Sequence, residues 1–324
     1  MKTAGRKSHL WIGKEAVRGT ADTPDFYIPW ATITNPDDIV TYVRNTASLG
    51  RLEQIDGADI VKKHGEPGWS AKLKVDHFGL VLLAWGGTDV PVAKSAPNAS
   101  VYDHTITINQ TVQHQSLTVG IKDDNVDYCF PNAMINTLEI NAEVGNYIMY
   151  TVTTMSKASV SASTTPSYTA KRDLLPQQVV FKHAANQAAL DAASPVIIRG
   201  FNIQFNANTM TEDNLGSVSP TDVLNQTVVI TGTITKTYSD ETFKAYQDAG
   251  TYRALRFDII SDEVIGTSAN PELKIDLYRA FISGWKKDMN QDGIEQETFN
   301  FEATLSITDA KMAQLILTNL IAAY

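Results

Sequence analysis

Alternation of apolar and polar residues, repeated in many short segments, constrains the fold of this chain more than any other feature. A period of two places successive side chains on opposite faces of a strand, so each segment has one buried face and one wetter face. The pattern predicts a mainly β protein whose antiparallel sheets pack as sandwiches. The clearest segments are Ala71–Val75, Thr105–Ile108, Leu117–Ile121, Phe201–Phe205, Val228–Thr235 and Leu273–Tyr278.

Two pairs of these segments are separated by turn residues and predict long hairpins. In the first, Leu138–Ala142 is followed by Gly145 and then by Tyr147–Val152. In the second, Phe281–Trp285 is joined to Thr298–Ala303 through Asn290-Gln291-Asp292-Gly293. The Asp-Gly pair supplies the positive-φ residues that tight turns require.

Helical signals are few and predict three short helices. His77–Trp85 is an apolar stretch that ends at a pair of glycines, and Asp240–Ala249 has an N-terminal cap and ends at Gly250. The third prediction is a C-terminal helix over Thr308–Tyr324, because four of its residues fall on one helical face. Those four residues are Met312, Leu315, Ile316 and Asn319.

The local composition of the chain changes between residues 156 and 196, where small polar residues and prolines are frequent. We expect a domain over 1–160, a linker over 161–195 with a short helix near Asn186–Ala192, and a second domain over 196–324. Both halves show the same order: strand, short helix ending in glycine, strand, long hairpin. The sequence therefore predicts two fused antiparallel β-sandwiches, each flanked by one short α-helix.

Composition excludes several classes of protein. With 43% hydrophobic and 19% charged residues, the chain has the composition of a soluble globular protein, and its apolar runs are too short to cross a bilayer. The net charge of −9 disfavours nucleic-acid binding, which depends on neutralising phosphates, but suits a surface that DNA passes without sticking. The single cysteine excludes an intrachain disulfide and favours a reducing compartment, and no secretory signal is expected.

Motifs of the common enzyme classes are absent from the sequence, and the remaining candidates for chemistry are weak. Asp288–Gly293 copies the first half of an EF-hand loop, but Phe299 stands where the bidentate carboxylate is needed, so a hairpin turn is favoured and weak calcium binding stays an alternative. His104 and His114 supply only two ligands, too few for a metal site. Cys129 has no identifiable base, which favours a buried structural thiol.

The five tryptophans are dispersed along the chain, which suits core or subunit contacts better than base stacking. A group of acidic residues near strand ends could line a lumen or could merely be solvated. They are Asp123, Asp124, Asp127, Glu139, Glu143, Glu295 and Glu297. The sequence thus identifies no catalytic, cofactor-binding or metal-ligating residue, and predicts no cofactor.

The stretch Trp11–Thr20 contains an Ile-Gly-x-Glu-x-x-x-Gly-Thr pattern, and an extended segment, Phe26–Pro29, follows it. This beginning resembles that of siphophage tail tube proteins, as do the segments Tyr102–Thr107, Ser116–Val119 and Phe243–Thr251. The fold of that family is a β-sandwich with one short helix, a long hairpin and extended terminal arms. The resemblance covers nearly the whole chain and rests on glycines, turns and strand order.

The resemblance implies a major tail tube protein of a long-tailed phage, a virion structural protein and not an enzyme. It implies stacked rings that conduct double-stranded DNA into the host, and synthesis in the host bacterial cytoplasm. The implied partners are other copies of the chain, the tape measure protein, the tail terminator, and the baseplate or tail-tip proteins, with no membrane. The repeated halves favour trimers of pseudo-sixfold symmetry over hexamers. The alternatives are a β-sandwich adhesin that binds carbohydrate or a receptor, and an enzyme of an unfamiliar family.

Overall fold

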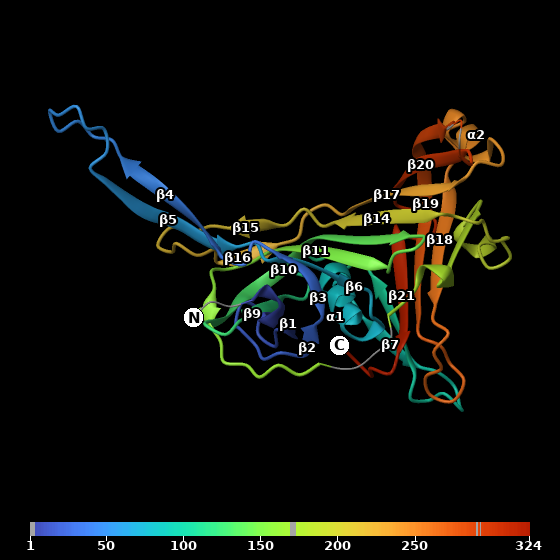
Figure 1. Ribbon diagram of the computed structural model, residues 1–324, viewed down its shortest axis with the longest axis horizontal. Coiled ribbons are helices and arrows are strands. Elements are labelled where there is room, and N and C mark those ends of the chain that lie inside the picture. Colours follow the sequence, from blue (N-terminus) through green and yellow to red (C-terminus); the bar gives the residue numbers. More distant parts are fainter. Residues whose placement is uncertain (1–3, 169–172, 290, 292) are drawn as a thin grey trace.

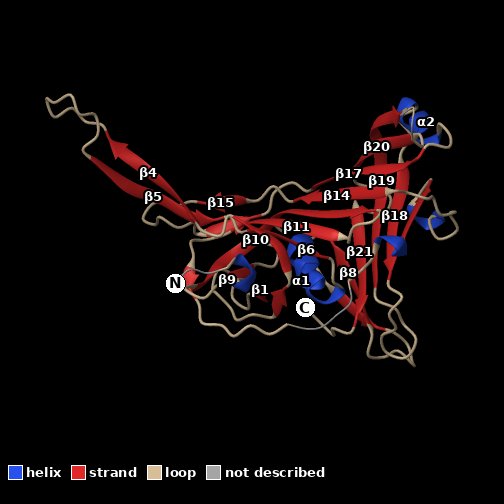
Figure 2. Cartoon of the chain, in the orientation of Figure 1, coloured by secondary structure: helices blue, strands red, loops and turns tan. Residues whose placement is uncertain are grey.

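The computed structural model describes residues 4–168, 173–289, 291 and 293–324, and over this range the chain is mainly β-sheet (Figure 1, Figure 2). The first half contains β1 (His9–Lys14), β2 (Phe26–Ile28), β3 (Trp30–Thr34), β4 (Asp38–Asn45), β5 (Gly57–Gly65), β6 (Gly68–Lys72), β7 (Val90–Ala93), β8 (Tyr102–Thr107), β9 (Leu117–Lys122), β10 (Asp127–Glu143), β11 (Met149–Met155) and β12 (Val160–Ser161). The second half contains β13 (Val179–Ala184), β14 (Gly200–Asn206), β15 (Met210–Glu212), β16 (Asp222–Leu224), β17 (Val229–Thr237), β18 (Arg253–Ile260), β19 (Glu272–Asp288), β20 (Gln296–Ala303) and β21 (Ala313–Asn319). The two α-helices are α1 (Val75–Gly86) and α2 (Thr242–Asp248). The mainly β prediction, both hairpins and both internal helices are confirmed.

One antiparallel sheet of eight strands runs through both halves of the molecule. Its order is β3-β6-β11-β10-β14-β17-β20-β19, and every neighbouring pair is antiparallel. The first four strands come from the first half of the chain and the last four from the second half. The pairing of β10 with β14 joins the two sets into a single sheet.

The two sets of four strands repeat one topology. In each set, the first strand leads through an inserted hairpin into the second strand, which leads into a helix; the insertions are β4–β5 and β15–β16. In the first set the pair β7–β8 comes next; in both sets a strand of the outer layer, β9 or β18, then leads into a strand of 17 residues, β10 or β19, and its hairpin partner, β11 or β20. The shared order of elements that the sequence predicts in the two halves therefore reflects a structural repeat.

The strands β10 and β19 are shared between two layers. The first part of β10 pairs with β9, which pairs with β1, whereas its later part belongs to the eight-stranded sheet. In the same way, the first part of β19 pairs with β18 and β21, and its later part pairs with β20. Register shifts interrupt both strands, between Phe130 and Ala133 and between Ile282 and Gly284, and such irregularities let a strand bend from one layer into another.

One large hydrophobic core lies between these layers and spans both halves, and a small separate cluster contains Ala184, Leu190 and Ala254. The helix α1 is buried on all sides, which fits its apolar sequence. Near its end, the ring of Trp85 packs edge to face on that of Phe205, with 4.8 Å between the ring centroids. In the second half, Phe243 of α2 stacks on Phe299 of β20 at 4.1 Å. Both helices and the outer layers pack on one side of the eight-stranded sheet. Within the described residues, no layer covers the opposite side of this sheet.

The predicted C-terminal helix over Thr308–Tyr324 is wrong, because residues Ala313–Asn319 form the strand β21. This strand lies between β19 and β8, which satisfy the backbone groups on both of its edges. Its residues Ala313, Leu315 and Leu317 are buried in alternation, so the period of two prevails over the apparent helical spacing.

Residues 161–195, expected to be a linker, contribute the strand β13 to the outer layer through its pairing with β18. The short helix expected near Asn186–Ala192 is a single turn of 3-10 helix at Gln187–Ala189. The division into domains at residues 160 and 195 stays a prediction. The turn residues Asn290 and Asp292 lie outside the described residues. No helix in the described part of the chain has the length and hydropathy needed to cross a membrane.

Candidate functional site

The uncovered side of the eight-stranded sheet is a broad polar surface, which we call the polar face. Paired residues form rows that cross the strands from one half of the chain to the other. One row consists of Ser70, Thr151, Glu139, Gln204, Thr231 and Glu302. A second row consists of Lys72, Met149, Asn141, Asn202, Thr233 and Asn300, and a third of Glu143, Gly200, Thr235, Thr298 and Lys286.

Side chains on the polar face bond to one another across the strands. Thr233 donates its hydroxyl to the Asn300 side-chain oxygen at 2.9 Å, and the hydroxyls of Thr235 and Thr298 lie 3.2 Å apart. The Asn202 amide donates to the Glu139 carboxylate across the junction between the two halves. Cross-strand pairs of this kind stabilise a sheet and hold its polar side chains in place.

The opposite side of the same strands is apolar, as the alternation requires. On β14, Phe201, Ile203 and Phe205 are buried, while Asn202 and Gln204 face outward; on β20, Phe299 is buried and Asn300 is exposed. A shift of one residue in any register would turn phenylalanines outward, so the core fixes the composition of the polar face.

Charges are sparse on the polar face. Its three rows carry the carboxylates of Glu139, Glu143 and Glu302 and the ammonium groups of Lys72 and Lys286, of which Lys72 pairs with Asp173 at 3.4 Å; the remaining side chains are mostly threonine, asparagine, glutamine and serine. The face is therefore polar, mildly acidic and without a cluster of cations. Such a surface offers DNA phosphates no countercharge.

Of the seven acidic residues predicted as candidates for a lumen, the structure places only Glu139 and Glu143 on the polar face. Asp123 accepts hydrogen bonds from its own loop, and Asp127 pairs with Lys122 at 2.9 Å. Asp124 pairs with Lys7, and Glu295 pairs with Lys287. Glu297 is buried beside Lys236 and accepts a hydrogen bond from the indole N–H of Trp285 at 2.6 Å.

The eight-stranded sheet ends in two strands with one unpaired edge each. Within the described residues, β3 pairs only with β6, and β19 from Phe281 onward pairs only with β20. Each therefore presents backbone N–H and C=O groups that a further strand can satisfy. A long sheet with two open edges favours pairing with other chains.

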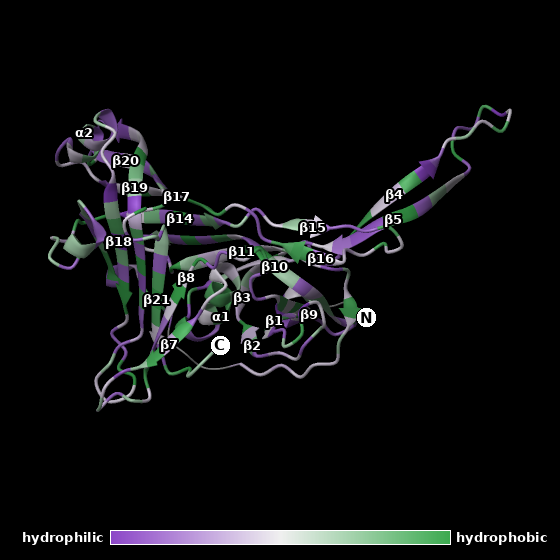
Figure 3. Ribbon diagram, turned by 180° about the vertical axis from the view of Figure 1, so that it is seen from behind, coloured by the Kyte–Doolittle hydropathy of each residue, from purple (hydrophilic) through white to green (hydrophobic). Residues whose placement is uncertain are grey.

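The hairpin β4–β5 leaves the body of the molecule as a two-stranded arm, plainly visible in Figure 1. Apart from its base, the arm is exposed on both faces, and Figure 3 shows hydrophobic segments along it. Its tip carries Leu49 and Leu52, which are 66% and 103% exposed, and Ile55 is also exposed. Large apolar side chains that no layer covers mark a surface for interaction with another molecule.

Charged side chains fix the base of the arm to the rest of the molecule. Asp38 accepts hydrogen bonds from the backbone N–H and hydroxyl of Ser159 and pairs with Lys63 at 2.9 Å. Lys62 pairs with Asp213 at 2.6 Å, beside the insertion β15–β16 of the second half. The shorter insertion thus braces the longer one, and the direction of the arm is set at its root.

Glu15, in the Ile-Gly-x-Glu-x-x-x-Gly-Thr stretch, is the buried centre of a hydrogen-bond network. Its side chain is almost inaccessible and accepts from the backbone N–H of Gly19 at 2.7 Å and of Asn132 at 2.6 Å. It also accepts from the hydroxyls of Ser116 and Thr118 on or next to β9. Gly19 has a φ of +76°, a conformation that favours glycine, so the motif encodes a turn folded around one carboxylate.

Arg18 extends this network to the second half of the chain. Its guanidinium pairs with Asp222 of β16 at 2.8 Å and donates to the backbone carbonyls of His114 and Val223. Asp222 also accepts from the Asn132 side chain at 2.7 Å. The roles of Glu15 and Arg18 were not predicted from the sequence, although a carboxylate between two glycines, Gly13 and Gly19, was a signal.

The predicted histidine pair does not form a metal site. His104 bonds to Asp89 and to the Ile321 carbonyl, whereas His114 bonds to the carbonyls of Trp85 and Asn109. Each ring thus has its own protein partners, and the described residues contain no group of three His, Cys, Asp or Glu side chains arranged for a metal ion.

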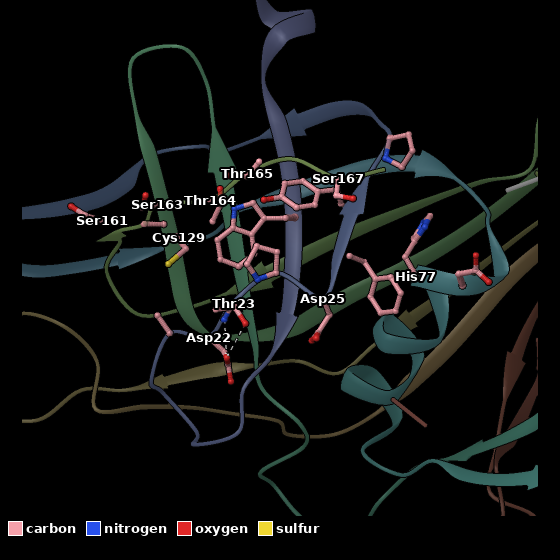
Figure 4. A pocket seen from close by; sticks show the side chains of 18 of the residues that line it. Asp22, Thr23, Asp25, His77, Cys129, Ser161, Ser163, Thr164, Thr165 and Ser167 are labelled. Atoms are coloured by element: carbon pink, nitrogen blue, oxygen red, sulfur yellow. Dashed lines mark hydrogen bonds between the residues drawn. The ribbon is translucent and has the colours of Figure 1, made fainter. Parts of the chain in front are cut away.

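A cavity of about 590 Å³ lies between the outer layer of the first half and residues 161–167 (Figure 4). Cys129 and His77 both line it, but Figure 4 shows them well separated. Burial, with the charges of Asp127 and Glu15, raises the pKa of Cys129 to about 11, so the thiol is protonated at neutral pH. Burial, with the charge of Lys74, lowers the pKa of His77 to about 3. The cavity therefore holds no activated nucleophile.

Comparison with known proteins identifies one family. The model of the family described as phage tail tube protein matches residues 5–303, which is nearly the whole chain. No curated protein matches the sequence.

We expect Glu15→Ala to destabilise the protein by about 3 kcal/mol, because several buried donors would lose their acceptor at once. Urea unfolding followed by circular dichroism measures the change. The control is Glu53→Ala, on the exposed arm, for which we expect a change below about 0.5 kcal/mol. Equal stability of the two variants would contradict the central role of Glu15.

Proposed function

This chain belongs to the phage tail tube protein family, and from that membership we propose that it is the major tail tube protein of a long-tailed phage of the siphophage type. The family is structural and not enzymatic, and its members form part of the virion tail. We propose further that three copies form a ring of pseudo-sixfold symmetry, and that stacked rings form the conduit for DNA ejection.

The observation that carries this proposal is the eight-stranded sheet with its repeat of four strands and its two unpaired edges. Within one chain, the last strand of the first set, β10, pairs with the first strand of the second set, β14. The equivalent strands at the open edges are β19 and β3. Pairing of β19 in one copy with β3 in the next would repeat the internal junction and close a ring without unpaired edges.

Simple geometry gives the size of such a ring. Three sheets of eight strands, at a spacing of about 4.8 Å, give a barrel circumference of roughly 115 Å and a backbone diameter of roughly 37 Å. A B-form duplex fits inside once inward side chains are subtracted.

The polar face supports an inward orientation of this side of the sheet. Its neutral hydrogen-bonding side chains and few carboxylates give passing DNA little to bind. The apolar side, the two helices and the outer layers would then face away from the lumen. On this proposal the lumen acids are Glu139 and Glu143, which the sequence analysis named, and Glu302, which it did not.

The arm supports contact between rings, because its apolar tip is exposed in the single chain and its base is fixed. We propose that the tip contacts a copy in the adjacent ring. The tape measure protein inside the tube, the tail terminator, and the baseplate or tail-tip proteins at its ends complete the proposed set of partners.

Native mass spectrometry of concentrated protein should show assemblies of three 35.5 kDa chains, and negative-stain microscopy should show rings or tubes.

Ala31→Pro should prevent assembly and leave a folded monomer. Ala31 lies on the open edge strand β3 and has no paired residue on β6, and proline would remove its backbone N–H.

The control for that variant is Ala31→Ser, which keeps the backbone donor and should assemble. A wild-type protein that stays monomeric at high concentration and after nucleation would contradict the tube, and rings of six chains would contradict the pseudo-sixfold trimer. Glycan binding by a stable monomer would favour the adhesin alternative.

Lysines on the polar face should make the tube retain DNA. Gln204→Lys combined with Asn300→Lys places two cations per chain on exposed positions of this face. We expect short duplex DNA to co-sediment with tubes of this variant at about 50 mM salt and to be released near 200 mM. Gln204→Ser with Asn300→Ser is the control and should not bind, and equal behaviour of the two variants would contradict a lumen lined by this face.

Removal of the apolar tip of the arm should impair stacking of rings. We expect a variant with Leu49, Leu52 and Ile55 replaced by serine to form rings but tubes several-fold shorter than wild type, because each buried apolar side chain contributes about 1.5–3 kcal/mol. Tube lengths in negative-stain images measure the effect. A matched variant with Thr46, Ser48 and Gln54 replaced by alanine should stack normally, and the opposite ranking would show that the tip makes no contact.

A further inference from the structure

The last described segment, Leu320–Tyr324, crosses α1 after leaving β21, and we call it the strap. Figure 1 places the end of the described chain beside α1. Little of the strap is buried, and a few polar bonds hold it. Lys14 donates from its ammonium group to the Tyr324 carbonyl at 2.6 Å, and Asn319 accepts from the Ile321 N–H at 2.8 Å.

The ring of Tyr324 lies in a notch on α1 that exists because residue 79 is glycine. A Cβ atom at Gly79 would stand 2.1 Å from the Tyr324 ring, so any other residue would expel the ring. The Tyr324 hydroxyl bonds to the backbone carbonyl of Asp76 and to the side chain of Asn319. The helix is thus shaped to receive this side chain.

His104 on β8 supplies the remaining contact, and its geometry requires a charged ring. The side chain is fully buried; Nδ1 lies 2.9 Å from the Asp89 carboxylate and Nε2 lies 2.8 Å from the Ile321 carbonyl. Both partners are acceptors only. A neutral imidazole has one N–H, so only the imidazolium satisfies both at once.

From this arrangement we infer that the strap is a pH-sensitive latch, fastened to the body by the imidazolium of His104 and released when that ring becomes neutral. The carboxylate of Asp89 holds the proton on Nδ1 by charge as well as by hydrogen bonding. The proton lost on neutralisation is therefore the one on Nε2, which faces Ile321. Loss of this proton leaves a lone pair on Nε2 that faces the carbonyl oxygen of Ile321, so the hydrogen bond between ring and strap is lost.

The other charged groups around the ring do not offset this change. Asp103, the neighbour of His104 on β8, is occupied by Lys94 at 3.0 Å and by the Thr318 hydroxyl. Tyr324 packs against the imidazole at 4.8 Å between ring centroids, and burial raises the pKa of its hydroxyl, which therefore stays neutral. Lys14 contacts the strap through the Tyr324 carbonyl. Asp89 is thus the anion that bonds directly to the imidazolium.

The direction of the pH dependence follows from the same contacts. Burial alone would lower the pKa of His104, but the hydrogen bonds that its ring donates to Asp89 and to the Ile321 carbonyl, the charge of Asp89 and a contact with the Asn319 side chain raise it above its ordinary value of 6.5. A group whose pKa is raised on folding contributes stability that is complete below its unfolded pKa and lost as the pH rises through the folded one. The strap is therefore fully fastened below about pH 6.5 and loosens as the pH rises through the raised pKa of His104.

Hydrogen–deuterium exchange of the full-length chain from pH 5.5 to 9 tests the latch. The protection factors of the strap amides, corrected with a free peptide of the same sequence, should fall about tenfold for each unit by which the pKa of His104 is raised. His104→Gln should give low protection at every pH, and Asp89→Asn should move the transition to lower pH while keeping the ring. An NMR titration of the His104 imidazole should show the same midpoint as the wild-type exchange curve.

His9→Gln is the control, because His9 lies on β1 and bonds to the Tyr168 hydroxyl, away from the strap. It should reproduce the wild-type profile. Protection that does not change with pH in the wild type, or an Asp89→Asn midpoint that does not move, would overturn the latch. Because the Asp89 variant and the NMR titration keep His104, they decide the matter even if the glutamine variant fails to fold.

Discussion

The pairing of β10 with β14 is the interaction on which the rest of the structure depends. Seven residue pairs, from Thr137 with Asn206 to Glu143 with Gly200, join two four-stranded sets into one sheet. Without this junction each half would present an open edge toward the other, and the core that spans both halves would be divided. The two faces of the sheet at this junction also differ in character. The pair Leu138 and Phe205 lies in the core, whereas the next pair, Glu139 and Gln204, lies on the polar face. The junction therefore fixes both the core and the surface proposed to contact DNA.

The shared strands β10 and β19 extend this effect from one layer to the other. Each passes from the outer layer into the eight-stranded sheet within one continuous backbone, so the layers cannot slide past one another without breaking a strand. The Glu15 and Arg18 network acts in the same sense, because it binds the N-terminal segment to β9, β10 and β16. Packing, long strands and buried polar bonds together make a stiff unit, which suits a protein that repeats along a tube.

Local patterns in the sequence were enough to predict most strands of the eight-stranded sheet and both internal helices. The alternation in Phe201–Phe205 and the glycine stops after Trp85 and Ala249 are local signals, and each element formed where they indicate. The segment after Thr308 was predicted wrongly because its apolar residues fit both periods, and only the neighbours β8 and β19 decide for a strand. The arm escaped notice because no layer covers it, so burial imposes no clear alternation on its residues. The polar face could not be predicted either, since it depends on the registers of eight strands, and these arise from tertiary pairing.

One of the differences between the two halves has a consequence for the proposed ring. Each half inserts a hairpin between its first two sheet strands, but β4–β5 is a long arm and β15–β16 is a short brace. A ring of three such chains has arms at alternate positions around its circumference, although its inner sheet repeats at every position. Neighbouring rings then have three equivalent azimuthal settings instead of six. In the proposed tube, fusion of the two halves would thus let one half set the rotation between neighbouring rings, while the other half is free of that constraint.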